Sequence, residues 1–476
     1  MERSPKMIIQ KTVKLAMEVF EQKMKDFADK ADTSELTADL ALEFSAALKN
    51  AFSEAGRKAY QAFIESYDIE QSILDLDGKK LRWKMVSPKE FLTPFGTMQI
   101  TRSLYQADAG GNAYCPLDDF WGMKDEFATE DVREAVAFSM AHLTSDETAQ
   151  LFEKCAWFHP SATAIKNITN NMGDFIEAHT ETIMSAVQQS QQLPKRTDVL
   201  VASMDGVNVL LREQGVQQGR PAERPGLKAS SSPNTAYKNA MTGVVSCYAL
   251  PLDPKEQRPQ RLQSRYIARM PQKRAVTFKE QFEQEVTAAE AKTPPDTTKV
   301  FLCDGHRSIW SYADNNPMYN DYEKLIDFYH TTEHLSKASE ALFGKSSQQS
   351  QAWYKKYRKK LLEEDDGAEC VLRSIAYYSQ NLRLSKSRSE KLEAERTYFR
   401  RNKGRMNYAD FIVRGLPIGS GPVEAACKSI VKTRLCRSGM RWSRQGGQHI
   451  LHLRCFVKSN RWDGFWKHYI QLKRAA

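Results

Sequence analysis

The sequence lacks several features that would place it in a membrane or outside the cell. No apolar run among its 476 residues approaches the roughly 18 residues of a membrane-spanning helix. The start, Met1 to Lys6, has no apolar core or small-residue cleavage site of a signal peptide. Eight cysteines are scattered singly without a Cys-x-x-Cys pair, which argues against zinc ribbons and disulfide scaffolds. We therefore expect a cytoplasmic protein with reduced thiols that makes no membrane contact.

Charge is distributed unevenly along the chain. The whole sequence has a net charge of +10. From Arg383 to the C-terminus there are 22 Lys and Arg against 6 Asp and Glu, a surplus of 16, so the preceding part is net acidic. A basic segment on an acidic chain indicates a partner with a phosphate backbone, with a solvated helical surface as the alternative.

The length exceeds what one hydrophobic core supports, which predicts several domains.

The first third of the chain is expected to be mainly helical. Residues 8–72 have apolar side chains at helical spacing and a break near Asp32-Thr33-Ser34. Residues 80–105 alternate around a Pro94-Phe95-Gly96 turn, which predicts a small hairpin.

Residues 129–187 return to helical spacing. The pattern starts a helix at Thr144, breaks it at Trp157 to Pro160 and starts another at Ser161. Two short helices across a tight turn are typical of a helix-turn-helix that reads DNA, and plain helical packing gives the same pattern.

The middle of the chain alternates between strand and helix patterns. Strands are expected at Val199–Leu211, Ala240–Leu250, Leu262–Ala268, Lys299–Cys303 and Lys324–Phe328, with a helix at Phe278–Ala291 and a polar loop at 212–238. The order of three strands, a helix, a strand, a short helix and a strand is that of an RNase H-like core. Helix without strand signal follows, from Thr331 to about Asp410.

Three acidic residues in separate motifs predict one metal site. Asp205 follows the apolar run Val199–Ala202, Asp304 follows Val300–Leu302, and Glu424 begins an apolar helical stretch. Carboxylate oxygens suit Mg²⁺ or Mn²⁺. Two such ions about 3.5–4 Å apart clamp the attacking and leaving oxygens of a phosphoryl transfer. A single Asp-Gly is usually only a turn, in which glycine lets the backbone bend sharply.

Further residues are candidates for supporting roles. Asp327 and His330 are predicted to orient a metal-bound carboxylate or a phosphate, and Lys428 to meet a phosphate. The alternatives are an Asp helix cap with packed histidines, a zinc site that adds His334, and a surface ion pair for Lys428. The predicted DNA contacts are Arg434, Arg437, Arg441, Trp442 and Arg444.

These motifs resemble those of a known family. They are Met204-Asp205-Gly206-Val207, Cys303-Asp304-Gly305 with the following His306 to Trp310, Ile326-Asp327-Phe328-Tyr329-His330, and Gly419-Ser420-Gly421-Pro422-Val423-Glu424. The chain is similar to the DDE transposases of bacterial insertion sequences, and within them to the ISKra-type family, related to Mutator-like and hAT-like transposases. The Asp-x-x-His after the second aspartate is the most specific element of this resemblance, which covers roughly residues 80–476.

The resemblance implies a fold, an activity and partners. Asp205, Asp304 and Glu424 would bind two Mg²⁺ ions, with Mn²⁺ as a substitute, for DNA cleavage by water and strand transfer by a 3′-hydroxyl. The partners would be double-stranded DNA, as terminal inverted repeats and target, and at least one further copy of the chain. The location would be the bacterial cytoplasm at the nucleoid. A transposase-derived DNA-binding protein without activity and an RNase H-like nuclease without strand transfer are the alternatives.

The expected architecture is multidomain α/β plus α, with an RNase H-like mixed-sheet catalytic core, an all-helical insertion and a helical N-terminal DNA-binding region. The predicted parts are an N-terminal helical region (1–79), a small β-rich segment (80–128), a helix-turn-helix-like region (129–195), the first part of the core (196–330), the insertion (331–415) and the last part of the core with the Glu424 helix and basic tail (416–476).

Overall fold

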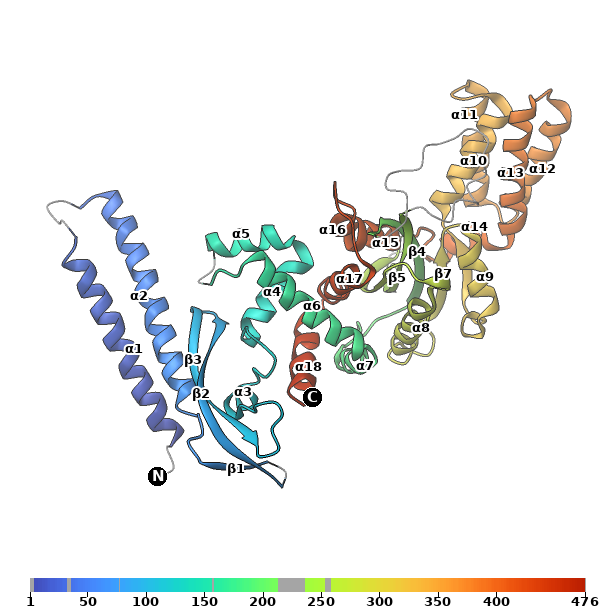
Figure 1. Ribbon diagram of the computed structural model, residues 1–476. Coiled ribbons are helices and arrows are strands. Elements are labelled where there is room, and N and C mark those ends of the chain that lie inside the picture. Colours follow the sequence, from blue (N-terminus) through green and yellow to red (C-terminus); the bar gives the residue numbers. More distant parts are fainter. Residues whose placement is uncertain are drawn as a thin grey trace. The chain divides into compact units, whose positions relative to one another are not determined.

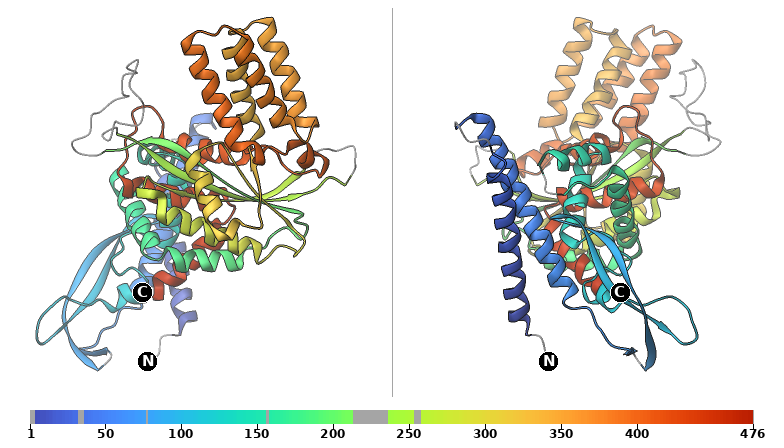
Figure 2. Two further views of the ribbon diagram at one scale, coloured as in Figure 1. Left: turned by 90° about the vertical axis from the view of Figure 1, so that its right-hand side faces the viewer. Right: turned by 60° about the vertical axis from the view of Figure 1, so that its left-hand side comes forward.

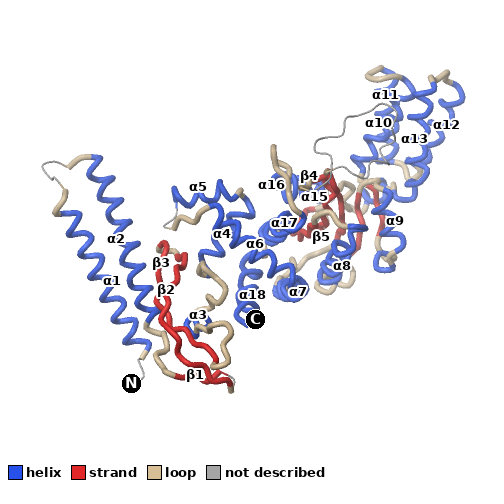
Figure 3. The backbone as a smooth tube through the Cα atoms, in the orientation of Figure 1, coloured by secondary structure: helices blue, strands red, loops and turns tan. Residues whose placement is uncertain are grey.

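The computed structural model describes residues 4–31, 36–76, 78–155, 158–212, 236–252 and 258–475. The chain divides into two compact units, one made of Met1–Asp174 with Tyr469–Ala476 and the other of Phe175–His468. Figure 1 shows the helices and strands, and Figure 3 marks the strands of two separate sheets in red. The protein is a mixed α/β structure, as the sequence pattern predicts.

The first unit begins with two long helices, α1 (Pro5–Ala28) and α2 (Ala38–Glu65), which pack against each other. Thr37 starts α2, because its hydroxyl accepts a backbone N–H of the first turn at 3.1 Å. The helices predicted within residues 8–72 are confirmed. The break predicted at Asp32 to Ser34 lies outside the described residues.

A three-stranded antiparallel sheet follows, in the order β1-β2-β3. The strands are β1 (Ile73–Leu76), β2 (Lys79–Thr93) and β3 (Gly96–Ala107). The predicted hairpin at 80–105 is confirmed, with Gly96 at φ +98° in the turn, whereas β1 was not predicted. One core of this unit consists of the buried side chains Ile64, Phe91, Met98, Ile100, Leu117 and Met123.

Short helices complete this part of the chain. They are α3 (Pro116–Phe120), α4 (Glu130–His142), α5 (Ser145–Cys155) and α6 (Ala162–Ala178), and α18 (Trp462–Ala475) ends the chain. The predicted helix start at Thr144 is confirmed as a capping box: Glu147 N–H donates to the Thr144 hydroxyl at 3.2 Å, and Thr144 N–H donates to the Glu147 carboxylate at 2.8 Å. A DNA-reading role for α5 and α6 stays a prediction.

The second unit contains a five-stranded mixed sheet in the order β6-β5-β4-β7-β8. Its strands are β4 (Val199–Leu210), β5 (Tyr237–Ala249), β6 (Gln260–Arg269), β7 (Thr298–Cys303) and β8 (Glu323–Ile326). β5 pairs antiparallel with β4 and β6, whereas β7 is parallel to β4 and β8. The predicted strands are all present, except that the last ends before Asp327 and Phe328.

Some helices of this unit connect its strands, and others form a bundle. They are α7 (Thr180–Ser190), η1 (Lys273–Ala275), α8 (Val276–Glu290), α9 (Arg307–Asn315), η2 (Pro317–Tyr319), α10 (Phe328–Phe343), α11 (Gln348–Glu363), α12 (Gly367–Asn381), α13 (Lys386–Asn402), η3 (Lys403–Arg405), α14 (Tyr408–Val413), α15 (Gly421–Ala426), η4 (Cys427–Lys432), α16 (Thr433–Leu435) and α17 (Arg444–Lys458). The predicted helical stretch from Thr331 to Asp410 is therefore confirmed, and Figure 2 shows α10 to α13 as a bundle.

Both faces of the five-stranded sheet are buried, because alternate side chains of β4 enter different cores. Leu200 and Ala202 pack with residues of α8 and α9, including Phe282. Val199 and Val201 belong to the core that contains residues of α10 to α14. The continuous apolar run at the start of β4 reflects this burial on two sides.

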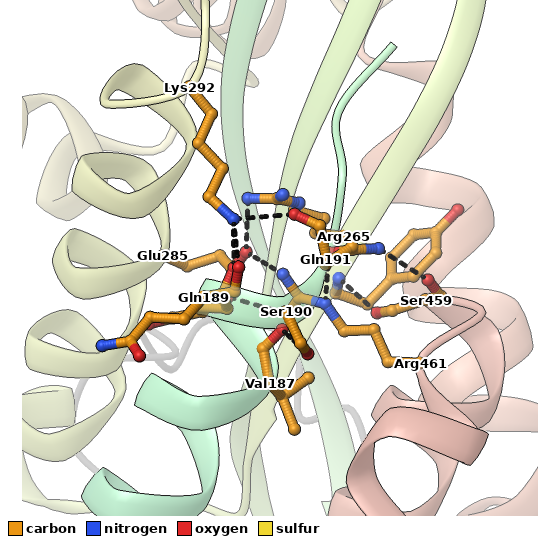
Figure 4. Close-up of polar contacts among 11 residues, drawn as sticks. Val187, Gln189, Ser190, Gln191, Arg265, Glu285, Lys292, Ser459 and Arg461 are labelled. Atoms are coloured by element: carbon orange, nitrogen blue, oxygen red, sulfur yellow. Dashed lines mark hydrogen bonds and ion pairs between the residues drawn. The ribbon is translucent and has the colours of Figure 1, made fainter.

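A buried ion cluster joins the sheet to α7, α8 and the segment after α17 (Figure 4). Glu285 of α8 is fully buried and accepts hydrogen bonds from Arg461 at 2.6 and 2.9 Å, from Arg265 of β6 at 3.2 Å and from Gln188 at 2.9 Å. Burial alone would raise the pKa of Glu285, but the two guanidiniums hold it below its usual range. Lys292 donates to three backbone carbonyls at the end of α7.

None of the described helices combines the length and apolar character that crossing a lipid bilayer demands.

Candidate active site

Of the two aspartates of the predicted triad, Asp205 lies within β4 and Asp304 directly follows the neighbouring strand β7. β4 and β7 are parallel, and their last register pair is Ala202 with Phe301. Asp205 and Asp304 each lie three residues beyond that pair, and the charge of Asp304 acts on the Asp205 carboxyl. Just before them, the N–H of the residue preceding Asp205 donates to the thiol sulfur of the residue preceding Asp304, 3.2 Å away. The structure thus brings these two predicted residues together.

Asp205 is partly buried and faces a second negative charge. Burial raises the pKa of its carboxyl above the usual range, and the charge of Asp304 raises it further. The Gly206 N–H, which donates to the carboxylate at 2.6 Å, and the charge of Lys432 act in the opposite direction. A carboxylate that is destabilised by a like charge gains from a nearby cation, which favours the ionised form.

Asp304 directly follows β7 and is tied to the start of α9. Its Oδ1 accepts the N–H of His306 at 3.0 Å, and its backbone carbonyl accepts the indole N–H of Trp310 at 2.6 Å. Within the described ranges, Oδ2 of Asp304 accepts no hydrogen bond. One oxygen is therefore used for positioning, and the other is available to a ligand.

The glycines after the two aspartates differ in their backbone, and each is closely approached by a neighbouring side chain. Gly206 continues β4, paired with Met241, and a Cβ there would overlap the Asn239 side chain. A Cβ on Gly305 would overlap the ring of Tyr398 from α13. Neither glycine has a positive φ. The predicted bend is present at Gly305, whereas Gly206 lies within a strand, where the absence of a side chain makes room for Asn239.

Asp327 is completely buried and joins two segments. It caps α10, because its Oδ1 accepts the N–H of His330 at 2.6 Å. Its Oδ2 accepts the N–H of Ser420, which holds the Gly419-Ser420 turn beside the end of β8. Asp327 therefore has both carboxylate oxygens engaged by backbone N–H groups. It positions the Glu424 segment and offers neither oxygen freely to a metal or phosphate.

Glu424 lies on α15, a short helix followed by the π-helical turn η4. The apolar positions predicted to face inward, including Val423 and Ile430, are buried, whereas Glu424 is exposed. Its Oε1 accepts the hydroxyl of Ser420 at 3.1 Å. One turn later, the Cys427 thiol donates to Oδ2 of Asp205 at 3.4 Å, which connects this segment directly to β4.

The three carboxylates are not gathered around a single point. Among the described residues, one group of three His, Cys, Asp or Glu has all its ligand atoms within 4.8 Å of one another, and it consists of Glu364, Asp366 and Cys370. Asp205, Asp304 and Glu424 do not meet that spacing. That spacing describes ligands of a single ion. Ligands of two ions about 3.5–4 Å apart are spread over a larger distance.

The two predicted histidines of α10 have separate surroundings. His330 is half-buried, with its ring 4.9 Å from that of His334 between centroids. The His334 ring stacks on Tyr398 at 3.6 Å, and its Nδ1 lies 2.6 Å from the Glu395 carboxylate. A zinc site from Asp327, His330 and His334 does not fit, because Asp327 is used as a helix cap.

The predicted DNA contacts fall into two groups. Arg434 is 2% exposed, and its guanidinium lies over the Trp442 ring, 5.1 Å from the centroid. The half-buried Trp442 donates its indole N–H to the Leu435 carbonyl at 3.0 Å. The structure therefore places Arg434 inside the protein, where it packs against Trp442, and not at a surface. Arg437, Arg441 and Arg444 are exposed, and their contact with DNA stays a prediction. Lys428, predicted to meet a phosphate, is exposed too, and that role also stays a prediction.

Sequence reasoning missed three residues at this site. Cys427 contacts Asp205, Lys432 acts on its pKa, and Tyr398 fills the space above Gly305. Cys427 lies three residues after Glu424, and residues at this spacing share one face of a helix, which was the available signal in the sequence. Tyr398 comes from a distant helix of the bundle and had no signal in the sequence.

The comparisons with known proteins do not show which family the chain belongs to. No family model matches the chain, and no curated protein matches it. A solved structure with some similarity is the Drosophila P element transposase strand transfer complex, at 12% identity and a TM-score of 0.24, covering 73% of this chain and 81% of that chain. A TM-score of this size does not demonstrate a shared fold.

Proposed function

We propose that the protein is a DDE transposase, which cuts DNA at the ends of its own element and joins those ends to target DNA. The observation that carries the proposal is that Asp205 and Asp304 lie equally far beyond the last register pair of the parallel strands β4 and β7, where their charges act on each other. The element order of the second unit supports assignment of its sheet to the RNase H-like fold. The basic segment from Arg383 onward supports a phosphate-bearing partner.

The carboxylate donor set fits Mg²⁺, with Mn²⁺ as a substitute. Asp205, Asp304 and Glu424 would hold two ions, since all three offer hard oxygen ligands. When bound, the ions activate the attacking water or 3′-hydroxyl and stabilise the leaving oxygen. The protein's own contribution is positioning: Asp327 fixes the turn before Glu424, and the Cys427 thiol orients Asp205.

Two alternatives use the same residues differently. A nuclease of the RNase H-like class would cut without joining. A DNA-binding protein that has lost its chemistry would bind without cutting. The unused Oδ2 of Asp304 and the raised pKa of Asp205 favour an active metal site over the second alternative.

The proposal predicts cleavage and joining that depend on a divalent cation. The substrates are a plasmid that carries the DNA flanking this protein's gene, where element ends would lie, and a single-stranded RNA of matched length. With Mg²⁺ we expect nicked plasmid and joined products, and with EDTA neither, while the RNA stays intact. Cleavage without joined products would favour the nuclease, and DNA binding without cleavage would favour the inactive protein.

A further inference from the structure

A basic pocket opens directly beside Asp304. It has a volume of about 340 Å³ and lies between α9 and the end of α13 with η3. Its lining includes Gly305, the residue after Asp304, and Tyr398, which lies against Gly305. All lining residues belong to the second unit.

Three arginines and one aspartate give the pocket a positive charge. Arg405 is paired with Asp314 and lies over the Trp310 ring, 4.6 Å from the centroid. Arg307 of α9 and Arg401 of α13 are exposed, and in the described part of the chain neither makes a hydrogen bond or an ion pair. The pocket therefore has two guanidiniums without an ion pair, one from α9 and one from α13.

The aromatic residues of the pocket are already covered. Trp310 is 3% exposed and lies under Arg405, and Tyr398 is stacked by His334. Trp310 therefore offers no open face to a base, and His334 occupies one face of Tyr398. The available chemistry is that of forked N–H donors, which match phosphate oxygens in geometry and charge.

We propose that this pocket binds the phosphodiester backbone of the nucleic acid strand that adjoins the scissile phosphate, through Arg307 and Arg401. The inference rests on the proposed function, because it takes Asp304 as the point where the strand is cut. A strand held there passes between α9 and the helical bundle, which gives the bundle a role in holding substrate. Recognition at this pocket is independent of base sequence, since phosphate contacts position a strand without reading it.

The test measures binding without metal, so that cleavage plays no part. The full chain is titrated against a fluorescein-labelled DNA duplex in EDTA at several salt concentrations. Arg307→Gln and Arg401→Gln are each expected to weaken binding and to reduce the slope of log K against log salt by about 0.7 to 0.9, the loss of one phosphate contact. Arg401→Lys is expected to restore most of the slope.

Arg400→Gln is the matched control. Arg400 is the neighbouring residue on α13, carries the same charge and does not line the pocket. Its substitution is expected to leave the slope within experimental error. If Arg307→Gln and Arg401→Gln change the slope no more than Arg400→Gln does, the proposal is overturned. Because binding is measured without Mg²⁺, the effect of these substitutions on binding can be interpreted even if the plasmid experiment shows no catalysis.

Discussion

Replacing Asp304 by alanine is expected to slow DNA cleavage about a thousandfold, since loss of a metal ligand removes several kcal/mol of transition-state stabilisation and each 1.4 kcal/mol is about tenfold in rate. The same loss is expected for Asp205→Ala, because the two residues share one site. The measurement is the single-turnover cleavage rate with Mg²⁺, with DNA binding in EDTA measured in parallel. Binding is expected to persist, because the aspartates repel phosphate.

A surface aspartate provides the control for this experiment. Asp321 lies close to the start of β8, is exposed and pairs with Lys299. Asp321→Ala removes the same charge and is expected to cleave at the wild-type rate. Asp304→Asn adds a finer test, because its amide oxygen can still accept the His306 N–H. A folded Asp304→Ala protein that cleaves normally would contradict the assignment of this residue.

Replacing Glu285 by alanine is expected to lower the free energy of unfolding of the second unit by about 3–5 kcal/mol. The substitution leaves the guanidiniums of Arg265 and Arg461 buried without their counter-charge. Both arginines are 4% exposed or less, so water cannot replace the lost carboxylate without opening the structure. Urea unfolding followed by far-ultraviolet circular dichroism measures the change.

Glu393→Ala serves as the comparison for Glu285→Ala. Glu393 pairs with Arg396 one turn away on α13, and both side chains are exposed. Pairs of this kind contribute about 0–1 kcal/mol. Equal small effects of the two substitutions would show that the cluster in Figure 4 does not stabilise the unit.

The strands that hold Asp205 and Asp304 were predictable because their apolar runs are buried on both sides of the sheet. The order of the elements along the chain followed from the same runs. Strand order and register did not, because they depend on pairing between segments about one hundred residues apart. The proximity of the two aspartates, predicted from their motifs, is seen in the parallel pairing of β4 and β7 and in the charge of Asp304 acting on Asp205.

The errors in the site prediction also have physical reasons. A sequence does not distinguish a buried arginine from a surface one, so Arg434 was assigned to DNA although it packs on Trp442. Asp327 was predicted to orient a metal-bound carboxylate or a phosphate, with a helix cap as the alternative. It caps α10 and holds the turn before Glu424, and its role beside a metal-bound carboxylate stays a prediction. Gly206 was taken as a turn residue, whereas it lies within β4 beside the Asn239 side chain of β5.

The most direct test of the central claim is to locate bound metal. Crystals of the full chain grown with DNA and Mn²⁺ would be measured at the manganese absorption edge. We expect two anomalous peaks about 3.5–4 Å apart, in contact with Asp205 and Asp304. The absence of a peak at these two aspartates, or a peak confined to Glu364, Asp366 and Cys370, would contradict the account.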